Sequence, residues 1–354
     1  MARSASAGMG PVRGEVRFVL TGLFMHIKTT VSAILLALAS VSASAQSFSL
    51  SNYTVKNTYG LDLSVGGVSG LEGSAITYAQ DRGTLFFIGD EGKGVIEMSL
   101  DGKSKGSMAF TGWGAFSTGV NGKNPGNDSE GLAYLGNGVL AVAEERLQNI
   151  YRFSYTAGGS VDLGTVPFAS VGSTIGNVGI EGLSYDARNG SYVTAKQDNP
   201  AALSIFNNLS FSTVASPDAV ANASFTGATS LFGLSQLSDV QTLSILGNNN
   251  LLVLSTGTTP GDSRELIEVT RAGTVVSRLD LTHIAARNAI EGVTIDEHDT
   301  IYLLAEQDQL SGAPANAKSQ LIVLTAPVPE PETYAMLLAG LGLMGAVARR
   351  RRAA

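Results

Sequence analysis

The chain has 354 residues and contains no cysteine. No disulfide can stabilise it, so its stability must come from a packed core. Basic residues are also few, 23 against 30 acidic ones, and the net charge of −7 opposes binding to nucleic acid and to anionic membrane surfaces. With 3 histidines in all, the sequence shows no Ser-His-Asp arrangement, no zinc-ligand spacing and no phosphate-binding glycine loop.

Long amphipathic helices are missing from the central part of the chain as well. Glycine is abundant, with 42 residues, and aromatic and β-branched residues recur in short runs between turn-forming residues. This composition predicts an all-β fold with many tight turns.

One hairpin-like segment occurs five times. Each copy opens with an acidic residue beside a small one, continues as a short apolar strand, turns at Gly, Asn or Asp, and returns as a second apolar strand. The opening acids are Glu72, Glu130, Glu181, Asp239 and Glu291, spaced by 58, 51, 58 and 52 residues. A regular spacing of this kind indicates one structural unit repeated along the chain.

A third strand follows the hairpins, clearly at 265–270 and 320–325 and less clearly at 202–206. Sheets of three or four strands at this spacing are typical of propeller blades, because one blade cannot bury both of its faces alone. The sequence therefore predicts a five-bladed β-propeller, with six blades as the alternative if residues 201–233 hold another blade. The strand at 48–55 is free to complete the last blade and close the ring. An open β-solenoid fits less well, because the inserts between the repeats are irregular.

The opening acids are expected to face one mouth of the ring. In a blade, the start of the innermost strand and the end of the next strand share a mouth, which brings Glu130 near Glu144 and Glu145, and Glu72 near Asp90. Many carboxylates at close quarters cannot all stay ionised without compensation, and Ca²⁺, which prefers oxygen ligands, supplies it. We predict a Ca²⁺ site that uses some of Glu72, Glu130, Glu181, Asp239 and Glu291.

A purely structural role is the alternative for these acids. The glutamates would then accept backbone N–H bonds or pair with Arg146 or Lys196. The glycine that follows four of them would only allow close packing at the narrow axis.

These segments resemble the SdiA-regulated family of bacterial β-propellers. The likeness lies in GTLFFIGDEGKGVIEMSLDG (83–102), AEERLQNIYRF (143–153), ELIEVTRAGTVV (265–276) and the Glu-Gly openings at Glu130, Glu181 and Glu291, and it covers about residues 65–324. It extends to the phytase-like propellers, a relation that makes metal binding in the mouth plausible. The fourth copy departs from the pattern, since it opens with Ser238-Asp239, which puts a borrowed metal site in doubt there.

The first 45 residues are typical of a secretory leader. Lys28 precedes an apolar stretch at 31–39, and Ala43-Ser44-Ala45 forms a cleavage site that signal peptidase would cut after Ala45. The residues before Met25 fit no part of such a signal, so we expect translation to start at Met25. The propeller domain is then expected over residues 46–326.

The C-terminal segment, residues 327–354, resembles a PEP-CTERM sorting tail. Its features are Pro329, Glu330 and Pro331, a 15-residue apolar run at 334–348, and four arginines, Arg349, Arg350, Arg351 and Arg352. The resemblance implies cleavage near the Pro-Glu-Pro motif by an exosortase in a Gram-negative bacterium. The run is short for a stable span, which needs about 20 residues, and we expect it to form a hydrophobic helix that holds the protein only transiently in the inner membrane. The alternative is an ordinary single-span anchor.

These features predict an exported module that binds a glycan or another matrix partner at the cell envelope, at the cell surface or in the extracellular matrix, with Ca²⁺ as a structural ion. The alternative is a metal-dependent phosphoesterase of phytase or esterase type, which the phytase-like relation implies. Such an enzyme needs a basic face beside its metals for an anionic substrate. The nearest basic residues are Arg146, Arg152, Lys196 and Arg287, and the sequence identifies no catalytic residue.

Overall fold

The computed structural model describes most of residues 48–353. The described ranges are 48–62, 64–69, 72–113, 128–198, 200–213, 225–228, 232–234, 236–257, 263–284, 289–306, 319–327 and 331–353. The predicted leader, residues 1–45, lies outside them.

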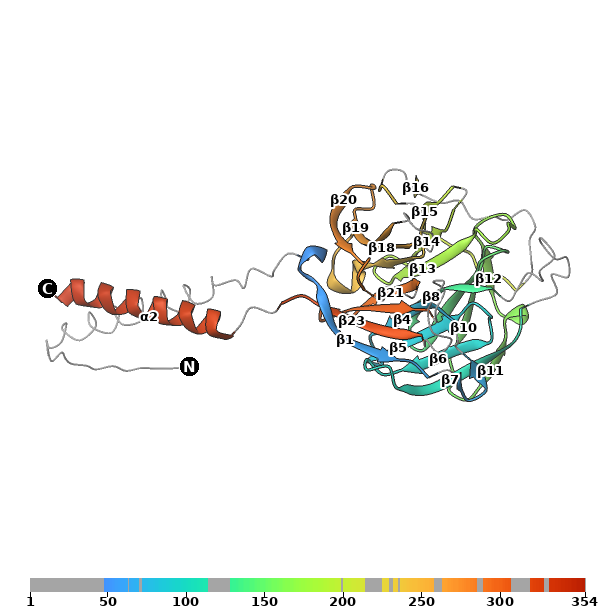
Figure 1. Cartoon of the computed structure of the whole chain (residues 1–354), viewed down its shortest axis with the longest axis horizontal. Coiled ribbons are helices and arrows are strands. Elements are labelled where there is room, and N and C mark those ends of the chain that lie inside the picture. Colours follow the sequence, from blue (N-terminus) through green and yellow to red (C-terminus); the bar gives the residue numbers. More distant parts are fainter. Residues whose placement is uncertain are drawn as a thin grey trace, which may run out of the picture. The chain divides into compact units, whose positions relative to one another are not determined.

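Five sheets form the blades of a propeller, as the repeats predict (Figure 1). Each repeat supplies the innermost strand of one blade, and the inner strands follow one another around the axis. They are β4 (Gly73–Ala79), β8 (Ser129–Gly136), β13 (Ile180–Asp186), β17 (Asp239–Thr242) and β21 (Ile290–Ile295). Each packs against the next in this order, and β21 packs against β4, so the ring is closed and the open solenoid is wrong.

The outer strands pair with the inner ones in chain order. In the first and second blades they are β5 (Thr84–Gly89), β6 (Gly94–Met98), β7 (Ser104–Gly112), β9 (Val139–Glu144), β10 (Asn149–Ser154) and β12 (Phe168–Ser170), with β11 (Ser160–Asp162) running parallel to β7. In the third and fourth they are β14 (Ser191–Lys196), β15 (Ala202–Phe206), β16 (Phe225–Ala228), β18 (Leu251–Thr256), β19 (Arg264–Val269) and β20 (Val275–Asp280). The short strands β2 (Ser64–Val65) and β3 (Val68–Ser69) form a hairpin of their own. Because β15 and β16 belong to the third sheet, the six-bladed alternative is wrong.

The N-terminal strand closes the ring. The fifth blade contains β22 (Ile301–Ala305), β23 (Gln320–Thr325) and β1 (Thr54–Gly60), which pairs antiparallel with β23. This role was predicted, but the bounds 48–55 were wrong, because the chain first makes a 3₁₀ turn, η1 (Leu50–Asn52). Leu50 is fully buried there and its backbone N–H donates to the Ser277 hydroxyl of the fourth blade. The segment before β1 thus also fastens the fourth blade.

Apolar side chains fill the spaces between neighbouring sheets. Phe86 and Tyr151 belong to one cluster between the first two blades, and Ile76 and Leu304 to another between the fifth and the first. Two further clusters join the second blade to the third and the third to the fourth. Burying each large apolar side chain stabilises the fold by about 1.5–3 kcal/mol, so this packing replaces the disulfides that the chain lacks.

Hydroxyl groups on the inner strands also tie several neighbouring blades together. Thr77 accepts a hydrogen bond from the backbone N–H of Tyr134 at 3.1 Å, and Ser184 accepts one from Thr242 at 2.9 Å. The same bond runs from Tyr78 to the Thr294 hydroxyl at 3.0 Å, across the junction where the fifth blade meets the first. These backbone groups cannot pair within their own sheet on the axis side, and the hydroxyls satisfy them.

Two further 3₁₀ turns, η2 (Leu163–Thr165) and η4 (Leu243–Leu246), lie between strands, and α2 (Pro331–Ala353) forms the C-terminal segment.

Candidate functional site

A β-bulge opens the inner strand of four blades. In the second blade Ser129 pairs with Glu144 and Gly131 with Ala143, so Glu130 has no partner of its own. The same shift in register leaves Glu181 and Glu291 unpaired in the third and fifth blades. A bulge re-aims the side chain of the extra residue, and here it frees three glutamates from the sheet at the same end of the ring.

The bulge also corrects the alignment of the repeats. In the first blade the extra residue is Ser74, not Glu72, which lies two residues earlier. In the fourth blade the register between β17 and β18 does not shift. Asp239 pairs there with Leu254, just as Gly182 pairs with Ala195 in the third blade. Asp239 therefore occupies the position of the glycine, and only three of the five opening acids are structural counterparts.

The glycine after each bulged glutamate allows neighbouring inner strands to approach closely. A Cβ on Gly182 would lie 2.7 Å from the Asp239 Cα and from the Val240 nitrogen, and one on Gly292 would lie 3.0 Å from the Ile76 nitrogen. This part of the structural alternative is confirmed.

Asp239 uses its carboxylate to hold the ring together. Its Oδ1 accepts from the Val240 N–H at 2.7 Å and its Oδ2 from the Val293 N–H of the fifth blade at 2.8 Å. The side chain is buried, and burial raises its pKa well above the ordinary value while backbone donors, including Leu183, oppose that rise. With both oxygens engaged, Asp239 is a poor candidate for a metal ligand.

The strongest candidate for a cation site lies between the first two blades. One oxygen each of Asp90, Asp128 and Glu130 lie within 4.8 Å of one another. Asp90 directly follows β5 and Asp128 directly precedes β8, and the Ser129 N–H donates to the Asp90 carbonyl at 3.2 Å. Asp90 Oδ1 is buried and has no hydrogen-bond partner among the described residues. Burial and the charges of Glu72 and Asp128 raise the pKa of Asp90 to about 7.

Two more carboxylates adjoin this trio. Glu145 is only 1 % exposed, and its Oε1 accepts from the Gly179 N–H at 3.1 Å. Burial and the contact with Asp128 raise its pKa to about 8. Burial and neighbouring carboxylates, Glu145 foremost, raise the pKa of Glu181 well above its usual range, and burial, Glu181 and Asp128 do the same for Glu130. Each of these carboxyls would ionise more readily beside a cation.

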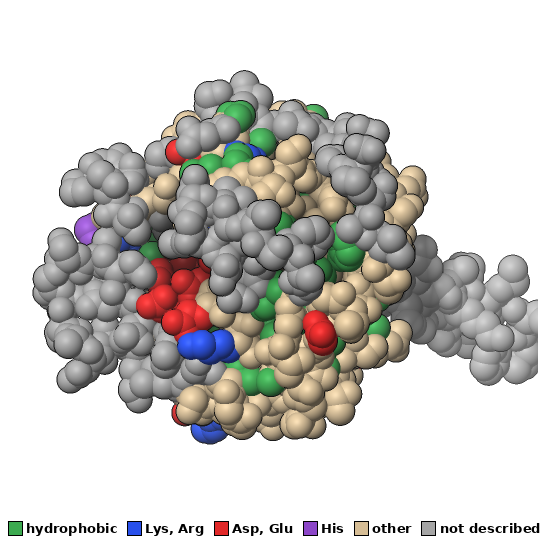
Figure 2. Space-filling model, turned by 90° about the vertical axis from the view of Figure 1, so that its right-hand side faces the viewer, with side chains coloured by type: hydrophobic (Ala, Val, Ile, Leu, Met, Phe, Trp, Pro, Cys, Tyr) green, Lys and Arg blue, Asp and Glu red, His purple; other side chains and the backbone are tan. Residues whose placement is uncertain are grey.

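Basic side chains compensate only part of this charge. Arg146 is buried, forms an ion pair with Asp128, lies 3.9 Å from Glu145 Oε2 and donates to Asn177. Lys196 donates to the carbonyls of Asp198 and Pro200. Figure 2 shows acidic side chains gathered in one hollow of the surface, with a basic side chain at its edge.

Glu291 and Glu72 lie toward the two sides of the cluster. Burial raises the pKa of Glu291 to about 7, while a hydrogen bond from Ser238 and the charge of Arg264 lower it. Glu291 acts electrostatically on Glu181 and on Asp239, and Glu72 acts on Asp90. The five predicted acids therefore do lie near one axis, but the trio that could share one ion contains a single one of them, Glu130.

Two members of the trio were not among the predicted ligands. Asp90 was expected beside Glu72, and this placement is confirmed by their electrostatic interaction. Asp128 was missed, although it stands directly before the Ser-Glu-Gly opening. Glu144 pairs with Ser129, next to Glu130, and its Oε2 also accepts from the Leu147 N–H in a tight turn.

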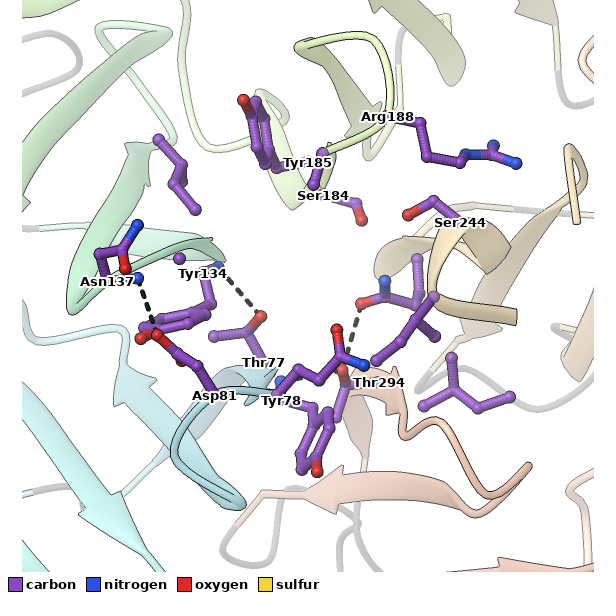
Figure 3. A pocket seen from close by; sticks show the side chains of 17 residues that line it. Thr77, Tyr78, Asp81, Tyr134, Asn137, Ser184, Tyr185, Arg188, Ser244 and Thr294 are labelled. Carbon is purple, nitrogen blue, oxygen red and sulfur yellow. Dashed lines mark hydrogen bonds between the residues drawn. The ribbon is translucent and has the colours of Figure 1, made fainter. Parts of the chain in front are cut away.

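The opposite mouth of the ring holds a separate cavity of about 500 Å³, lined by the ends of all five inner strands and the turns that follow them (Figure 3). It carries hydroxyl, amide and aromatic side chains in place of the carboxylate cluster. The sequence analysis did not anticipate it.

The sequence profile of the SdiA-regulated family matches residues 51–309, which is most of the chain. The chain belongs to the SdiA-regulated family. This match agrees with the five-bladed ring and covers both mouths described above. A second profile, the PEP-CTERM protein-sorting motif, matches residues 327–352.

The sorting tail of this SdiA-regulated protein forms α2, which begins at Pro331 and carries Arg350, Arg351 and Arg352 in its last turn. Proline suits a first helical position, and arginines suit the negative end of the helix dipole. Pro329 and Glu330 lie outside the described residues. A tail of this kind implies export, targeting to the cell surface and processing by exosortase. None of the described helices combines the length and hydropathy needed to cross a bilayer, so the predicted span at 334–348 is not confirmed.

Comparison with solved structures finds similarity only at low sequence identity. The tail fibre of Staphylococcus aureus phage P68 is 11 % identical, with a TM-score of 0.50 over 81 % of this chain, and the chain spans only 55 % of that protein. A luciferin-regenerating enzyme is 9 % identical with a TM-score of 0.44 over 77 % of this chain and 95 % of its own. Kuenenia stuttgartiensis hydrazine synthase is 13 % identical with a TM-score of 0.37 over 75 % of this chain and 65 % of its own. At 11 % identity, the similarity to the phage tail fibre concerns the fold alone.

Proposed function

We propose that this exported propeller is a binding module of the cell envelope or extracellular matrix, and that it holds Ca²⁺ in its acidic mouth. One observation supports the ion above all: the oxygens of Asp90, Asp128 and Glu130 lie within 4.8 Å of one another. Two oxygens that both touch a Ca²⁺ ion at about 2.4 Å lie at most about 4.8 Å apart. The spacing of the trio therefore fits one shared ion.

The donor set fits the chemistry of this ion. All three side chains are carboxylates, the ligands that Ca²⁺ prefers, and Asp90 Oδ1 is a buried acceptor without a hydrogen-bond partner in the described ranges. Glu145 and Glu181 interact electrostatically with the trio, and a bound cation would lower their raised pKa values so that they ionise and add negative charge. Arg146 holds Asp128 in place by its ion pair. The ion would join the end of β5 to the start of β8 and so stabilise the junction of two blades.

The phosphoesterase alternative receives less support. An anionic phosphoester needs basic groups that are available to it, yet Arg146 is engaged by Asp128 and Asn177. The guanidinium of Arg152 stacks on the Phe211 ring at 4.7 Å, and Lys196 is bonded to backbone carbonyls. Arg287 lies outside the described residues. The geometry favours binding as the function.

Calorimetric titration of the purified, metal-free protein with CaCl₂ tests the ion. We expect saturable heat, with affinity reduced tenfold or more in Glu130→Gln and in Asp128→Asn, each of which removes a charge from the trio. Asp62→Asn, at an exposed position of the first described range, should leave the titration unchanged. Absence of heat, or heat that both trio variants leave intact, would rule out this site.

A strain without exosortase tests the sorting step. We expect the uncleaved protein to remain in the inner membrane, because α2 and its arginines are no longer removed. Signal peptidase is expected to remove the leader in either strain. Normal release from the mutant would contradict processing near Pro329, Glu330 and Pro331, and fractionation of the wild type shows whether the mature domain is attached or released.

A further inference from the structure

The cavity at the second mouth is formed by corresponding positions of all five blades. Its wall contains Thr77, Tyr134, Ser184, Gln241, Ser244 and Thr294 from the ends of the inner strands and the turn η4. In Figure 3 the labelled hydroxyls of Thr77, Ser184 and Ser244 point toward a common centre. A volume of about 500 Å³ is in the range of pockets that bind small organic molecules.

The lining of this cavity has no excess charge. Its charged residues are Asp81 and Arg188, which are opposite in sign. Arg188 donates to both oxygens of the buried Asp186, at 3.0 and 2.9 Å, and Asp81 Oδ2 accepts from the Asn137 N–H at 2.9 Å. Because both charges already have partners within the protein, the cavity favours an uncharged ligand over an anion or a metal ion.

The polar groups of the wall both donate and accept. A hydroxyl has one hydrogen and two lone pairs, and Thr77 uses one lone pair for the Tyr134 N–H. In the described part of the chain its hydrogen has no recorded acceptor, so it can donate to a ligand. The Thr294 hydroxyl donates to Gln241 Oε1 at 3.2 Å, which turns the Gln241 amide and fixes its position. A ligand that matches this wall carries several hydroxyl groups.

Rigid aromatic surfaces stand beside these polar groups. The Tyr134 ring stacks on Phe86, with centroids 5.9 Å apart, and its hydroxyl accepts from the Gly138 N–H at 2.7 Å. The Tyr185 ring packs on Tyr192 at 5.0 Å. A pyranose ring has an apolar C–H face that packs on such rings and an edge of hydroxyls that pairs with Ser, Thr and Gln side chains. Side chains held by existing bonds lose little entropy when a ligand arrives.

We infer that the second mouth is a binding site for a neutral hexose unit, free or at the end of a glycan. This narrows the envelope or matrix partner of the proposed function to a saccharide class. The site does not need the cation of the opposite mouth, so the saccharide and Ca²⁺ experiments can fail separately.

Saturation-transfer difference NMR and calorimetry on the full chain, in the presence of chelator, test this site. The probes are D-glucose, D-galactose and N-acetylglucosamine, each up to about 10 mM, with D-glucuronate as the charged counterpart. We expect at least one neutral sugar to bind with a millimolar or lower Kd, and glucuronate to bind at least tenfold more weakly.

Two variants locate the binding. Tyr185→Ala removes an aromatic wall, and Ser244→Trp fills the cavity with an indole ring; each should weaken binding at least tenfold. Tyr59→Ala, which removes another partly buried tyrosine in β1, is the matched control and should bind as the wild type does. Circular dichroism confirms that each variant is folded, and Thr77→Val replaces any variant that is not. The inference would be overturned if no saturation transfer to any neutral sugar were detected. It would also be overturned if sugar binding persisted in every folded cavity variant.

Discussion

Asp239 in the fourth blade binds the backbone of Val293 in the fifth: the Val293 N–H donates to Asp239 Oδ2 at 2.8 Å. The second oxygen, Oδ1, accepts from the Val240 N–H in the same blade at 2.7 Å. A residue that the repeat pattern groups with possible metal ligands thus connects inner strands. Its carboxylate takes the place of the ladder bonds that a sheet edge at the axis cannot make.

Asp239→Ala should lower the free energy of unfolding by about 1–3 kcal/mol, because buried N–H groups lose their acceptor. Urea unfolding measures this change. Asp62→Ala, at an exposed position, should stay within about 0.5 kcal/mol of the wild type. The heat of Ca²⁺ binding per folded molecule, measured by calorimetry, should be the same in both variants. A variant at 239 that unfolds like the wild type would contradict the structural role.

Gly182→Ala should destabilise the ring by about 1–3 kcal/mol, since the new Cβ meets backbone atoms of Asp239 and Val240 at 2.7 Å. Gly73→Ala is the graded comparison, because its Cβ meets only side-chain atoms of Leu304, at 3.0–3.1 Å, which can move. Thermal unfolding should therefore rank Gly182→Ala below Gly73→Ala in Tm. The reverse order would show that the two inner strands are not in close contact.

Thr294→Val removes the hydroxyl that accepts from the Tyr78 N–H at the closing junction. We expect a loss of about 1 kcal/mol in the free energy of unfolding, which Thr294→Ser should largely restore because it keeps the oxygen. Equal stability of the Val and Ser variants, measured by urea unfolding, would mean that this bond contributes nothing to closure.

The stability of the metal-free protein should fall as pH rises from about 5 to 8. The pKa of Asp90 is raised from 3.8 to about 7 and that of Glu145 from 4.5 to about 8, so ionisation costs the folded state more than the unfolded one. The neutral carboxyls contribute their full stability at pH values below the pKa that each group has in the unfolded protein. This stability is lost as the pH rises through the pKa that the group has in the folded protein.

Differential scanning calorimetry in chelator measures this effect, and Glu145→Gln should flatten the decline. Saturating CaCl₂ should raise Tm most at the upper end of the range, because a cation stabilises the ionised carboxylates of the site. A Tm that stays constant or increases from about pH 5 to 8 in chelator would contradict the raised pKa values.

Much of the fold could be predicted from the sequence. The five hairpins, the closing N-terminal strand and the sorting tail each have a local pattern, either alternating apolar runs with turn residues or a motif beside an apolar run. The first strand was placed too early, because the burial of Leu50 and the bond between its N–H and Ser277 depend on a blade 227 residues away in the chain.

The candidate site was only partly predictable. The Glu-Gly openings led to Glu130, Glu181 and Glu291, whose bulges lie at equivalent places. Spacing alone could not show that Ser74 takes this position in the first blade, or that Asp239 takes the position of the glycine. A shift of one residue in a strand turns the side chain to the other face, and no count of residues between repeats reveals it.

The amino-acid sequence by itself determined that the chain is a ring of five sheets carrying an export tail, because apolar periodicity, turn residues and the sorting motif are local properties. Only the tertiary structure decided which carboxylates share a site and what lies at the other mouth. Asp128 joins Asp90, and Thr77 faces Ser184, because bulged inner strands from separate repeats meet at one axis. Such contacts are set by strand register and ring closure, which exist only after the blades have packed together.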